Sequence, residues 1–411
     1  MAQFFDELET RSFEERTEEL NKLLPIVIAK AQSETPYYGN TLSKIDARDI
    51  DEVEKLQNLP LVRKSDLIEL QRVQPPFGGL NTRPANEMGR VFQSPGPIYE
   101  VHGRCYDATR VARALFACGM RSKDLVFNTY SYHLTPAGLM SDEGAKALGC
   151  AVFPAGPTQT ELQVQALAAL RPTGYIGTPS FLNILLDRAA SLKLDVSSLS
   201  HASVGAEPLP YSLRESFRAR GIDAYQAYGT AELGLVAYET EALEGMVVTE
   251  GVIVEVVRPG TNEVVQDGEV GELVVTVLDP DYPMIRFATG DLTAVLKGRC
   301  PTGRTNRRIK GWMGRADQTT KVRGMFVHPQ QVHAILQIHP EISRARLCVT
   351  NENYRDELVL RCEVAPDGTQ SGAAIEATLK NVCKLRGNVE IVDIGDLPND
   401  GKIIDDLRDF R

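Results

Sequence analysis

Three residues that could handle a phosphorylated ligand lie close together near the middle of this 411-residue chain. Gly229, Thr230 and Glu232 follow an apolar run that ends at Tyr228. Glycine permits a positive φ and a close approach of a ligand to the backbone. A threonine hydroxyl can hydrogen-bond a phosphate oxygen, and a carboxylate can bind a hard cation such as Mg²⁺. An ordinary strand–turn–helix junction is the alternative interpretation, and this segment alone does not decide between them.

Three further motifs follow along the chain. Residues 287–292 read Phe-Ala-Thr-Gly-Asp-Leu and place Asp291 at an expected strand end. Residues 314–324 read Gly-Arg-Ala-Asp-Gln-Thr-Thr-Lys-Val-Arg-Gly, and residues 397–403 contain Lys402. Each motif is short, and the four in this order are far more specific than any one of them.

Composition excludes several classes of protein. The net charge of −10, with no basic stripe to offset it, argues against a nucleic-acid partner. No apolar run reaches about 18 residues, so we expect no membrane span. The N-terminus lacks a secretory pattern. The seven cysteines are widely spaced and show no zinc-site spacing, so we expect free thiols and a cytoplasmic location.

The elements that must position these residues alternate between strand and helix. Between residues 125 and 220, short apolar strands are separated by helical stretches, which predicts βαβ units and a parallel sheet of the α/β class. Ligands bind at the carboxyl ends of the strands in such sheets. The polar loops at Tyr130, Gly177, Gly205 and Tyr228 are all expected there, so we predict that they converge on one site.

The rest of the chain has a different pattern. Residues 75–103 are rich in proline and glycine and are expected to form loops. After residue 244, β-rich segments joined by turns predict antiparallel hairpins. The last 95 or so residues alternate helix and strand and are enough for a small α+β domain. We therefore expect an N-terminal domain of residues 1–315 and a C-terminal domain of residues 316–411.

The ordered motifs resemble the adenylate-forming acyl-CoA synthetase superfamily, and most closely its phenylacetate-CoA ligase branch, over nearly the whole chain. The resemblance implies a large N-terminal αβαβα domain with parallel sheets and a small β-rich subdomain, followed by a mobile α+β lid. It implies that a small carboxylic acid is activated with ATP and Mg²⁺ as an acyl-adenylate. Coenzyme A then displaces AMP. A homodimer is compatible with this interpretation.

The resemblance also assigns roles to residues of this sequence. Lys402 neutralises charge between the carboxylate and the α-phosphate, and Glu232 binds Mg²⁺ beside Thr230. A solvated tail lysine and a surface turn aspartate are the alternatives for Lys402 and Asp291. The residues expected at the nucleotide are Gly205, Ala206, Glu207, Tyr228, Gly229, Asp291 and Arg315.

Five further positions carry roles by resemblance. Asp317 corresponds to the hinge of the lid, and Gly324 to a glycine beside the tunnel for coenzyme A. Tyr132, His133 and Phe181 are expected at the acyl pocket, where the two aromatic rings suit an aryl acid. Ordinary core aromatics and a structural histidine are equally compatible with these three positions.

The sequence departs from the family at its phosphate-binding loop. The family has a Ser/Thr/Gly-rich loop with a lysine, whereas residues 90–100 read Arg-Val-Phe-Gln-Ser-Pro-Gly-Pro-Ile-Tyr-Glu. Each proline lacks the N–H that a phosphate cradle uses, and Glu100 adds negative charge if it points inward. Ala231 stands where the family usually has threonine.

Three hypotheses follow. The first is an ATP-dependent aryl-CoA ligase with an altered loop around residues 93–97. The second is an adenylating or acyl-transferring biosynthetic relative that uses another acceptor. The third is a non-catalytic protein that keeps an adenylate pocket, against which Gly324 and Lys402 argue, because a binding protein needs neither half-reaction.

Overall fold

A computed structural model shows a chain divided into two compact units, Met1–Met313 and Gly314–Arg411. The structure describes residues 3–104, 107, 109–259, 261–316, 320–323, 325–327, 329–352, 355–364, 372–398 and 402–408. Asp317 and Gly324, which were predicted to be the hinge and the glycine beside the coenzyme A tunnel, lie outside these residues.

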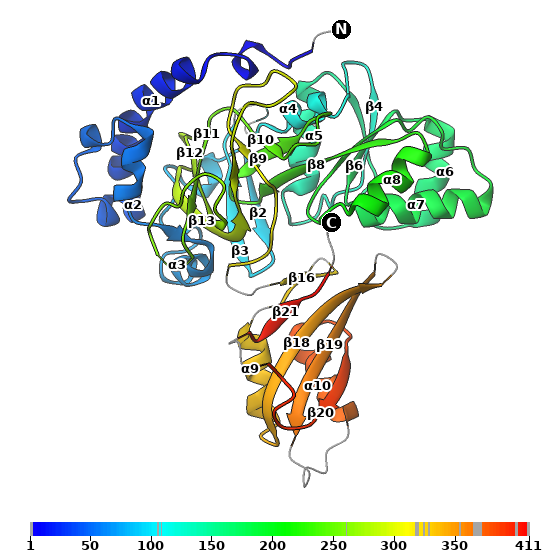
Figure 1. The fold of residues 1–411 in the computed structure, drawn as a ribbon. Coiled ribbons are helices and arrows are strands. Elements are labelled where there is room, and N and C mark those ends of the chain that lie inside the picture. Colours follow the sequence, from blue (N-terminus) through cyan, green and yellow to red (C-terminus); the bar gives the residue numbers. More distant parts are fainter. Residues whose placement is uncertain are drawn as a thin grey trace. The chain divides into compact units, whose positions relative to one another are not determined.

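The first unit is built on a nine-stranded sheet with the order β14-β15-β10-β9-β8-β7-β6-β4-β5 (Figure 1). Its parallel strands are β4 (Leu125–Asn128), β5 (Ala151–Pro154), β6 (Gly174–Gly177), β7 (His201–Val204) and β8 (Asp223–Thr230). Its antiparallel strands are β9 (Gly234–Glu239), β10 (Met246–Val248), β14 (Val295–Leu296) and β15 (Arg308–Ile309).

Helices cover both faces of the parallel strands. Val126 and Ile176 pack in one buried cluster with α4 and α5, while the adjacent Phe127 and Tyr175 pack in another with α6, α7 and α8. Neighbouring residues of a strand point to opposite faces, so the two clusters mark the two faces. This confirms the predicted α/β class. The helices are α4 (Val111–Ala117), α5 (Ala137–Ala147), α6 (Thr160–Leu170), α7 (Pro179–Leu192) and α8 (Tyr211–Ala219).

A smaller sheet with the order β1-β13-β12-β11 completes this unit together with the N-terminal segment. Phe287 of this sheet shares a buried cluster with Leu24 and Ile28 of the first helix. The strands are β1 (Val62–Arg63), β11 (Val252–Val257), β12 (Gly271–Val277) and β13 (Met284–Thr293). The helices are α1 (Phe13–Glu34), α2 (Pro36–Thr41) and α3 (Leu67–Val73), with 3₁₀ turns at Glu7–Glu9, Ala47–Asp49, Val53–Asn58, Lys64–Asp66 and Ala85–Glu87.

One local expectation was wrong. The stretch expected to be loops contains an antiparallel hairpin of β2 (Arg90–Ser94) and β3 (Ile98–His102). Its prolines and glycine occupy the tip, where they do not interrupt the ladder. After Thr230 the chain makes a turn and returns as strand β9, with Thr230 paired to Gly234, so the alternative of a strand–turn–helix junction does not apply. Gly234 adopts a φ of +70°, which suits glycine.

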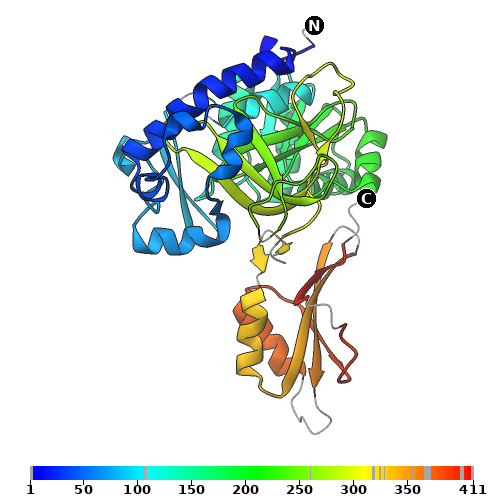
Figure 2. The ribbon, with the colours of Figure 1, turned by 60° about the vertical axis from the view of Figure 1, so that its left-hand side comes forward.

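The second unit forms a four-stranded sheet with the order β20-β19-β18-β21, and α9 and α10 pack on one face of it (Figure 2). Leu347 and Leu360 of the sheet share a buried cluster with Ile335 and Leu379 of the two helices. The elements are β16 (Thr320–Val322), β17 (Met325–Val327), α9 (Pro329–Ile338), β18 (Ile342–Glu352), β19 (Arg355–Val364), α10 (Gly372–Cys383), β20 (Asn388–Val392) and β21 (Ile404–Asp406).

Arg286 of β13 joins the smaller sheet to the N-terminal segment. Its side chain is 0% exposed, and its Nε lies 2.9 Å from Oε2 of Glu255 in β11. The same guanidinium donates to the carbonyl oxygens of Gln57, at 3.1 Å, and Leu59, at 2.6 Å. Arg286 therefore neutralises a buried carboxylate and satisfies two backbone acceptors at once.

We expect Arg286→Met to lower the free energy of unfolding of this unit by about 3–5 kcal/mol, because it leaves Glu255 buried without a counter-charge. Chemical unfolding followed by emission of Trp312, the single tryptophan, measures this. Arg218→Met removes an exposed pair with Glu215 and serves as the control. Equal midpoints for the two variants would contradict the prediction.

Candidate active site

The carboxyl ends of the parallel strands lie side by side, as predicted. The amide N–H of Thr129, after β4, donates to the carbonyl of Ile176 in β6 at 2.8 Å. The N–H of Gly205, after β7, donates to the carbonyl of Gly177 at 3.2 Å. A Cβ atom at Gly205 would lie 2.7 Å from the carbonyl oxygen of Ala227 in β8, so only glycine fits there. The loops that follow β4, β6 and β7 and the end of β8 therefore meet at one edge.

Tyr228 and Asp291 connect the two sheets at this edge. The hydroxyl of Tyr228, in β8, donates to Oδ2 of Asp291, in β13, at 2.6 Å. The indole Nε1 of Trp312 donates to Oδ1 of the same carboxylate at 3.0 Å. Two aromatic side chains thus orient the aspartate. Trp312 carried no role in the sequence analysis, and no local pattern marks it, since it contacts Asp291 only through the fold.

Glu232 lies in the turn between β8 and β9 and is paired with a lysine from the N-terminal part of the chain. Nζ of Lys64 lies 2.8 Å from Oε1 and 3.1 Å from Oε2 of Glu232. Burial of the carboxylate opposes its ionisation, but the charge and hydrogen bond of Lys64 outweigh it, so the pKa of Glu232 is lowered. The two residues are 168 positions apart, which is why sequence motifs did not connect them.

The pairing of β1 with β13 positions this lysine. Arg63 lies opposite Ala288 in the parallel register of the two strands. Lys64 follows at once, in the 3₁₀ turn Lys64–Asp66, beside the segment that leads to Asp291. The ammonium group is therefore held near both the β8–β9 turn and the end of β13.

The β2–β3 hairpin occupies the place of the expected phosphate loop. Its backbone pairs in an antiparallel ladder, with Phe92 opposite Glu100 and Ser94 opposite Ile98. The Ser94 hydroxyl donates to the carboxyl group of Glu100, whose side chain points inward and is fully buried. Burial and the nearby charge of Glu232 raise the pKa of Glu100 to about 8, although Ser94 and Lys64 oppose the shift. Glu100 therefore carries a proton at neutral pH and adds little negative charge.

Other predicted nucleotide residues lie on the same edge. Gly205 is buried, whereas Ala206 is exposed and adopts a φ of +64°, and Glu207 is half-buried. Gly229 is exposed, and the Thr230 hydroxyl accepts a hydrogen bond from the N–H of Leu233 at 3.3 Å.

Arg315 and Lys402 belong to the second unit. Nζ of Lys402 lies 3.0 Å from Oδ1 of Asp405, and Asp405 also pairs with Arg346 at 3.3 Å. Arg315 is half-buried. The first unit thus brings Tyr228, Thr230, Glu232 and Asp291 together, while the predicted lysine is held by an aspartate of its own unit.

The three predicted acyl-pocket residues have different surroundings. The Tyr132 hydroxyl accepts from Nδ2 of Asn128 at 2.8 Å and lies 3.4 Å from Oδ1 of Asp142. Burial raises its pKa. Phe181 packs against the core cluster of α6, α7 and α8, and His133 is exposed. Of these three side chains, Tyr132 is the one that hydrogen bonds to described residues hold at the carboxyl edge.

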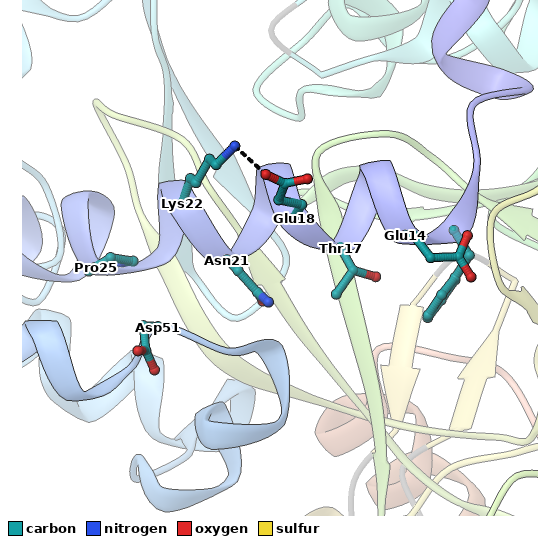
Figure 3. A pocket seen from close by; sticks show the side chains of 8 residues that line it. Glu14, Thr17, Glu18, Asn21, Lys22, Pro25 and Asp51 are labelled. Atoms are coloured by element: carbon teal, nitrogen blue, oxygen red, sulfur yellow. Dashed lines mark hydrogen bonds and ion pairs between the residues drawn. The ribbon is translucent and has the colours of Figure 1, made fainter.

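An open groove along α1 contains none of the predicted residues (Figure 3). It has a volume of about 690 Å³, and its lining includes an exposed pair in which Lys22 donates to Glu18 at 2.6 Å. Within the described residues, no three His, Cys, Asp or Glu side chains form a metal cluster, and no helix is long and apolar enough to cross a membrane. The carboxyl edge is therefore the candidate site. The groove is lined by Phe13, Glu14, Thr17, Glu18, Asn21, Lys22, Pro25 and Asp51.

We expect stability to depend on pH through Glu100. A glutamic acid titrates near pH 4.3 in an unfolded chain, whereas the folded protein holds this proton up to about pH 8. The folded state binds more protons between these values, so the free energy of unfolding falls as pH rises, by up to about 1.4 kcal/mol per pH unit. Glu100→Gln should remove this component.

Chemical unfolding at about pH 5.5 and about pH 7.5, followed by Trp312 emission, compares the wild type with this variant. Glu241→Gln changes an exposed carboxylate and is the control. The wild type and Glu241→Gln should lose stability at the higher pH, and Glu100→Gln should lose less. The same loss in all three would show that Glu100 ionises normally.

Comparisons with known proteins identify the family of this chain. The family model described as AMP-binding enzyme matches residues 138–277. The phenylacetate-coenzyme A ligase of Aromatoleum evansii is 32% identical over 358 residues, which cover 83% of this chain and 80% of that protein. The phenylacetate-coenzyme A ligase of Escherichia coli K12 is 30% identical over 438 residues, which cover 98% of each.

A solved structure is similar to this chain over the whole length of the chain. The crystal structure of 2-hydroxyisobutyryl-CoA ligase in complex with 2-HIB-AMP and CoA superposes with a TM-score of 0.85 at 26% identity, covering 100% of this chain and 93% of that one. Relatives at this identity and coverage share the family and not the fold alone. The chain therefore belongs to the adenylate-forming acyl-CoA synthetase superfamily, in its phenylacetate-CoA ligase branch.

Proposed function

We propose that the protein is an ATP-dependent ligase that activates a small aromatic carboxylic acid as its acyl-adenylate and transfers the acyl group to coenzyme A. The observation that supports this most is the pairing of two polar centres on one edge. Tyr228, Asp291 and Trp312 form the first, and Lys64 with Glu232 forms the second. A nucleoside and a charged phosphate chain need such a pair of adjacent sites.

In the first half-reaction, a carboxylate oxygen of the acid bonds to the α-phosphorus of ATP, and the bond to the bridging oxygen of pyrophosphate breaks. Asp291 suits the ribose, because its carboxylate is already oriented by two donors and accepts hydroxyl hydrogen bonds. Lys402 is proposed to neutralise charge between the two anionic reactants, which repel each other without a cation.

Mg²⁺ would be held by Glu232 together with the phosphates of ATP. A buried carboxylate with a lowered pKa supplies the hard oxygen that this ion prefers, and Mg²⁺ commonly binds through one carboxylate plus substrate phosphates. The ion, when bound, offsets negative charge on the phosphate oxygens. One carboxylate fits a metal that would arrive with the nucleotide, because the phosphates would supply further oxygen ligands.

In the second half-reaction, the thiol sulfur of coenzyme A bonds to the acyl carbon. The bond between this carbon and the phosphate oxygen of AMP breaks, and AMP leaves. Movement of the second unit about Asp317, and passage of the thiol beside Gly324, are proposals carried by the family likeness. An aromatic acid is supported by Tyr132 near the carboxyl edge and by the relatives, which are named phenylacetate-coenzyme A ligases.

Pyrophosphate exchange tests the proposal. The purified protein with ATP, Mg²⁺ and a panel of aryl and short aliphatic acids should incorporate labelled pyrophosphate into ATP with at least one acid. Added coenzyme A should then yield a thioester and AMP. Exchange without a thioester would favour another acyl acceptor. No exchange with any acid, alongside measurable AMP binding, would favour an adenylate-binding protein and overturn the proposal.

We expect Lys402→Ala to slow pyrophosphate exchange by on the order of 100-fold, because it removes a cation from the adenylation step. Thioester formation from supplied acyl-adenylate and coenzyme A should change little. Lys380→Ala, on the exposed face of α10 in the same unit, is the control. Equal loss of both half-reactions would show that the lysine has another role.

A further inference from the structure

We propose that Lys64 binds the β- and γ-phosphate end of ATP, a role for which the β2–β3 hairpin offers no lysine. This inference rests on the proposed use of ATP and adds a residue that the sequence motifs did not mark. Hairpin residues 90–100 contain no lysine, and their backbone is engaged in a ladder instead of forming an open cradle.

The ammonium group of Lys64 lies where a phosphate chain would extend from the nucleoside site. On one side, β1 places it beside the strand that carries Asp291. On the other side, its charge acts on both Glu232 and Glu100, which ties it to the β8–β9 turn and the hairpin. Lys64 therefore adjoins the strand that carries Asp291, contacts the β8–β9 turn and acts on a buried carboxyl group of the hairpin.

The exposure of the pair indicates the direction from which a ligand arrives. The side chain of Glu232 is 0% exposed and that of Lys64 is 21% exposed, so the ammonium lies on the solvent side of the carboxylate. A cavity of only about 20 Å³ borders Glu232 elsewhere, between His102, Arg110 and Tyr282. Such a volume accommodates about one water molecule. A phosphate chain must therefore approach from the side of Lys64.

The neighbouring arginines form ion pairs or hydrogen bonds with other residues. Arg63 pairs with Glu272 at 3.0 Å, and Arg90 pairs with Glu143 of α5. Arg110 is half-buried and donates to the carbonyl oxygen of Leu233. Among the described residues around the hairpin and the β8–β9 turn, Lys64 is thus the cation directed at the Glu232 carboxylate and partly open to solvent.

Lys64 can exchange the Glu232 carboxylate for phosphate oxygens without leaving a buried charge unmatched. Without nucleotide, the ammonium of Lys64 is matched by the carboxylate of Glu232, while Glu100 carries its proton. If Mg²⁺ binds Glu232 together with ATP, the ammonium of Lys64 would be able to pair with the terminal phosphate oxygens, because the metal would then offset the charge of the carboxylate. A lysine suits this exchange, because its flexible stem carries a compact charge that can reorient.

The test compares ATP and AMP binding, measured by titration calorimetry, in wild type, Lys64→Met and Lys64→Arg. We expect Lys64→Met to weaken ATP binding by about tenfold or more and AMP binding by less than about threefold. Arginine keeps the charge and should recover most of the loss. Lys55→Met, the same change at an exposed lysine, should alter neither affinity.

The two half-reactions give a second readout. Lys64→Met should lose pyrophosphate exchange while keeping thioester formation from supplied acyl-adenylate, because only the first needs the triphosphate end. Parallel loss of ATP and AMP affinity, or of both half-reactions, would make Lys64 a structural partner of Glu232 and overturn the inference. Wild type that binds AMP but not ATP would overturn the proposed function as well.

Lys64→Met leaves Glu232 buried without its counter-charge, so folding needs its own control. Trp312 emission and the unfolding midpoint report whether the variant is folded. If it is not, the comparison moves to Lys64→Met/Glu232→Gln against Glu232→Gln alone. The ratio of ATP to AMP affinity should still fall by about tenfold, and an unchanged ratio would contradict the inference.

Discussion

The buried ion pair between Lys64 and Glu232 is the contact on which the geometry of the site depends. A carboxylate removed from water requires a counter-charge, and this one comes from a segment that is otherwise remote. This ion pair therefore holds the N-terminal segment against the β8–β9 turn. It also sets the electrostatic environment of Glu100, which retains its proton partly because Glu232 is ionised close by. Removing either partner would disturb three separate segments of the chain.

The site uses two sheets with different architectures. The parallel sheet supplies loops that converge because all of its strands end on the same edge. The smaller sheet supplies Asp291 from β13 and, through its pairing with β1, the position of Lys64. The hydrogen bond between Tyr228 and Asp291 is where the two meet. Neither sheet alone supplies both Tyr228 and Asp291.

Much of the fold followed from periodicity in the sequence. The alternation of strands and helices between residues 125 and 220 appears as strands β4 to β7 and helices α5 to α8, because the apolar residues of each element have a clear period. The convergence of the loops at Tyr130, Gly177 and Gly205 followed from the rule for parallel sheets. The β2–β3 hairpin was missed because its turn residues are typical of loops.

The site was predictable only where it lies in continuous motifs. Tyr228, Glu232 and Asp291 could be found because short stretches around them resemble a family. Lys64 and Trp312 could not, since each acquires its role from a partner distant in the chain. Pairing between β1 and β13, which determines where Lys64 lies, rests on a strand of two residues, too short to give a sequence signal.

The two hydrophobic clusters of the parallel sheet have a consequence for how this protein can change over time. Val126 and Ile176 support one face, and Phe127 and Tyr175 support the other, while the loops after β4, β6 and β7 begin only where these strands end. Exposed residues of these loops, such as His133 and Ala206, pack in neither cluster. Such positions can change without disturbing the core of the sheet, so the surface of this edge is free to diverge faster than the scaffold that carries it.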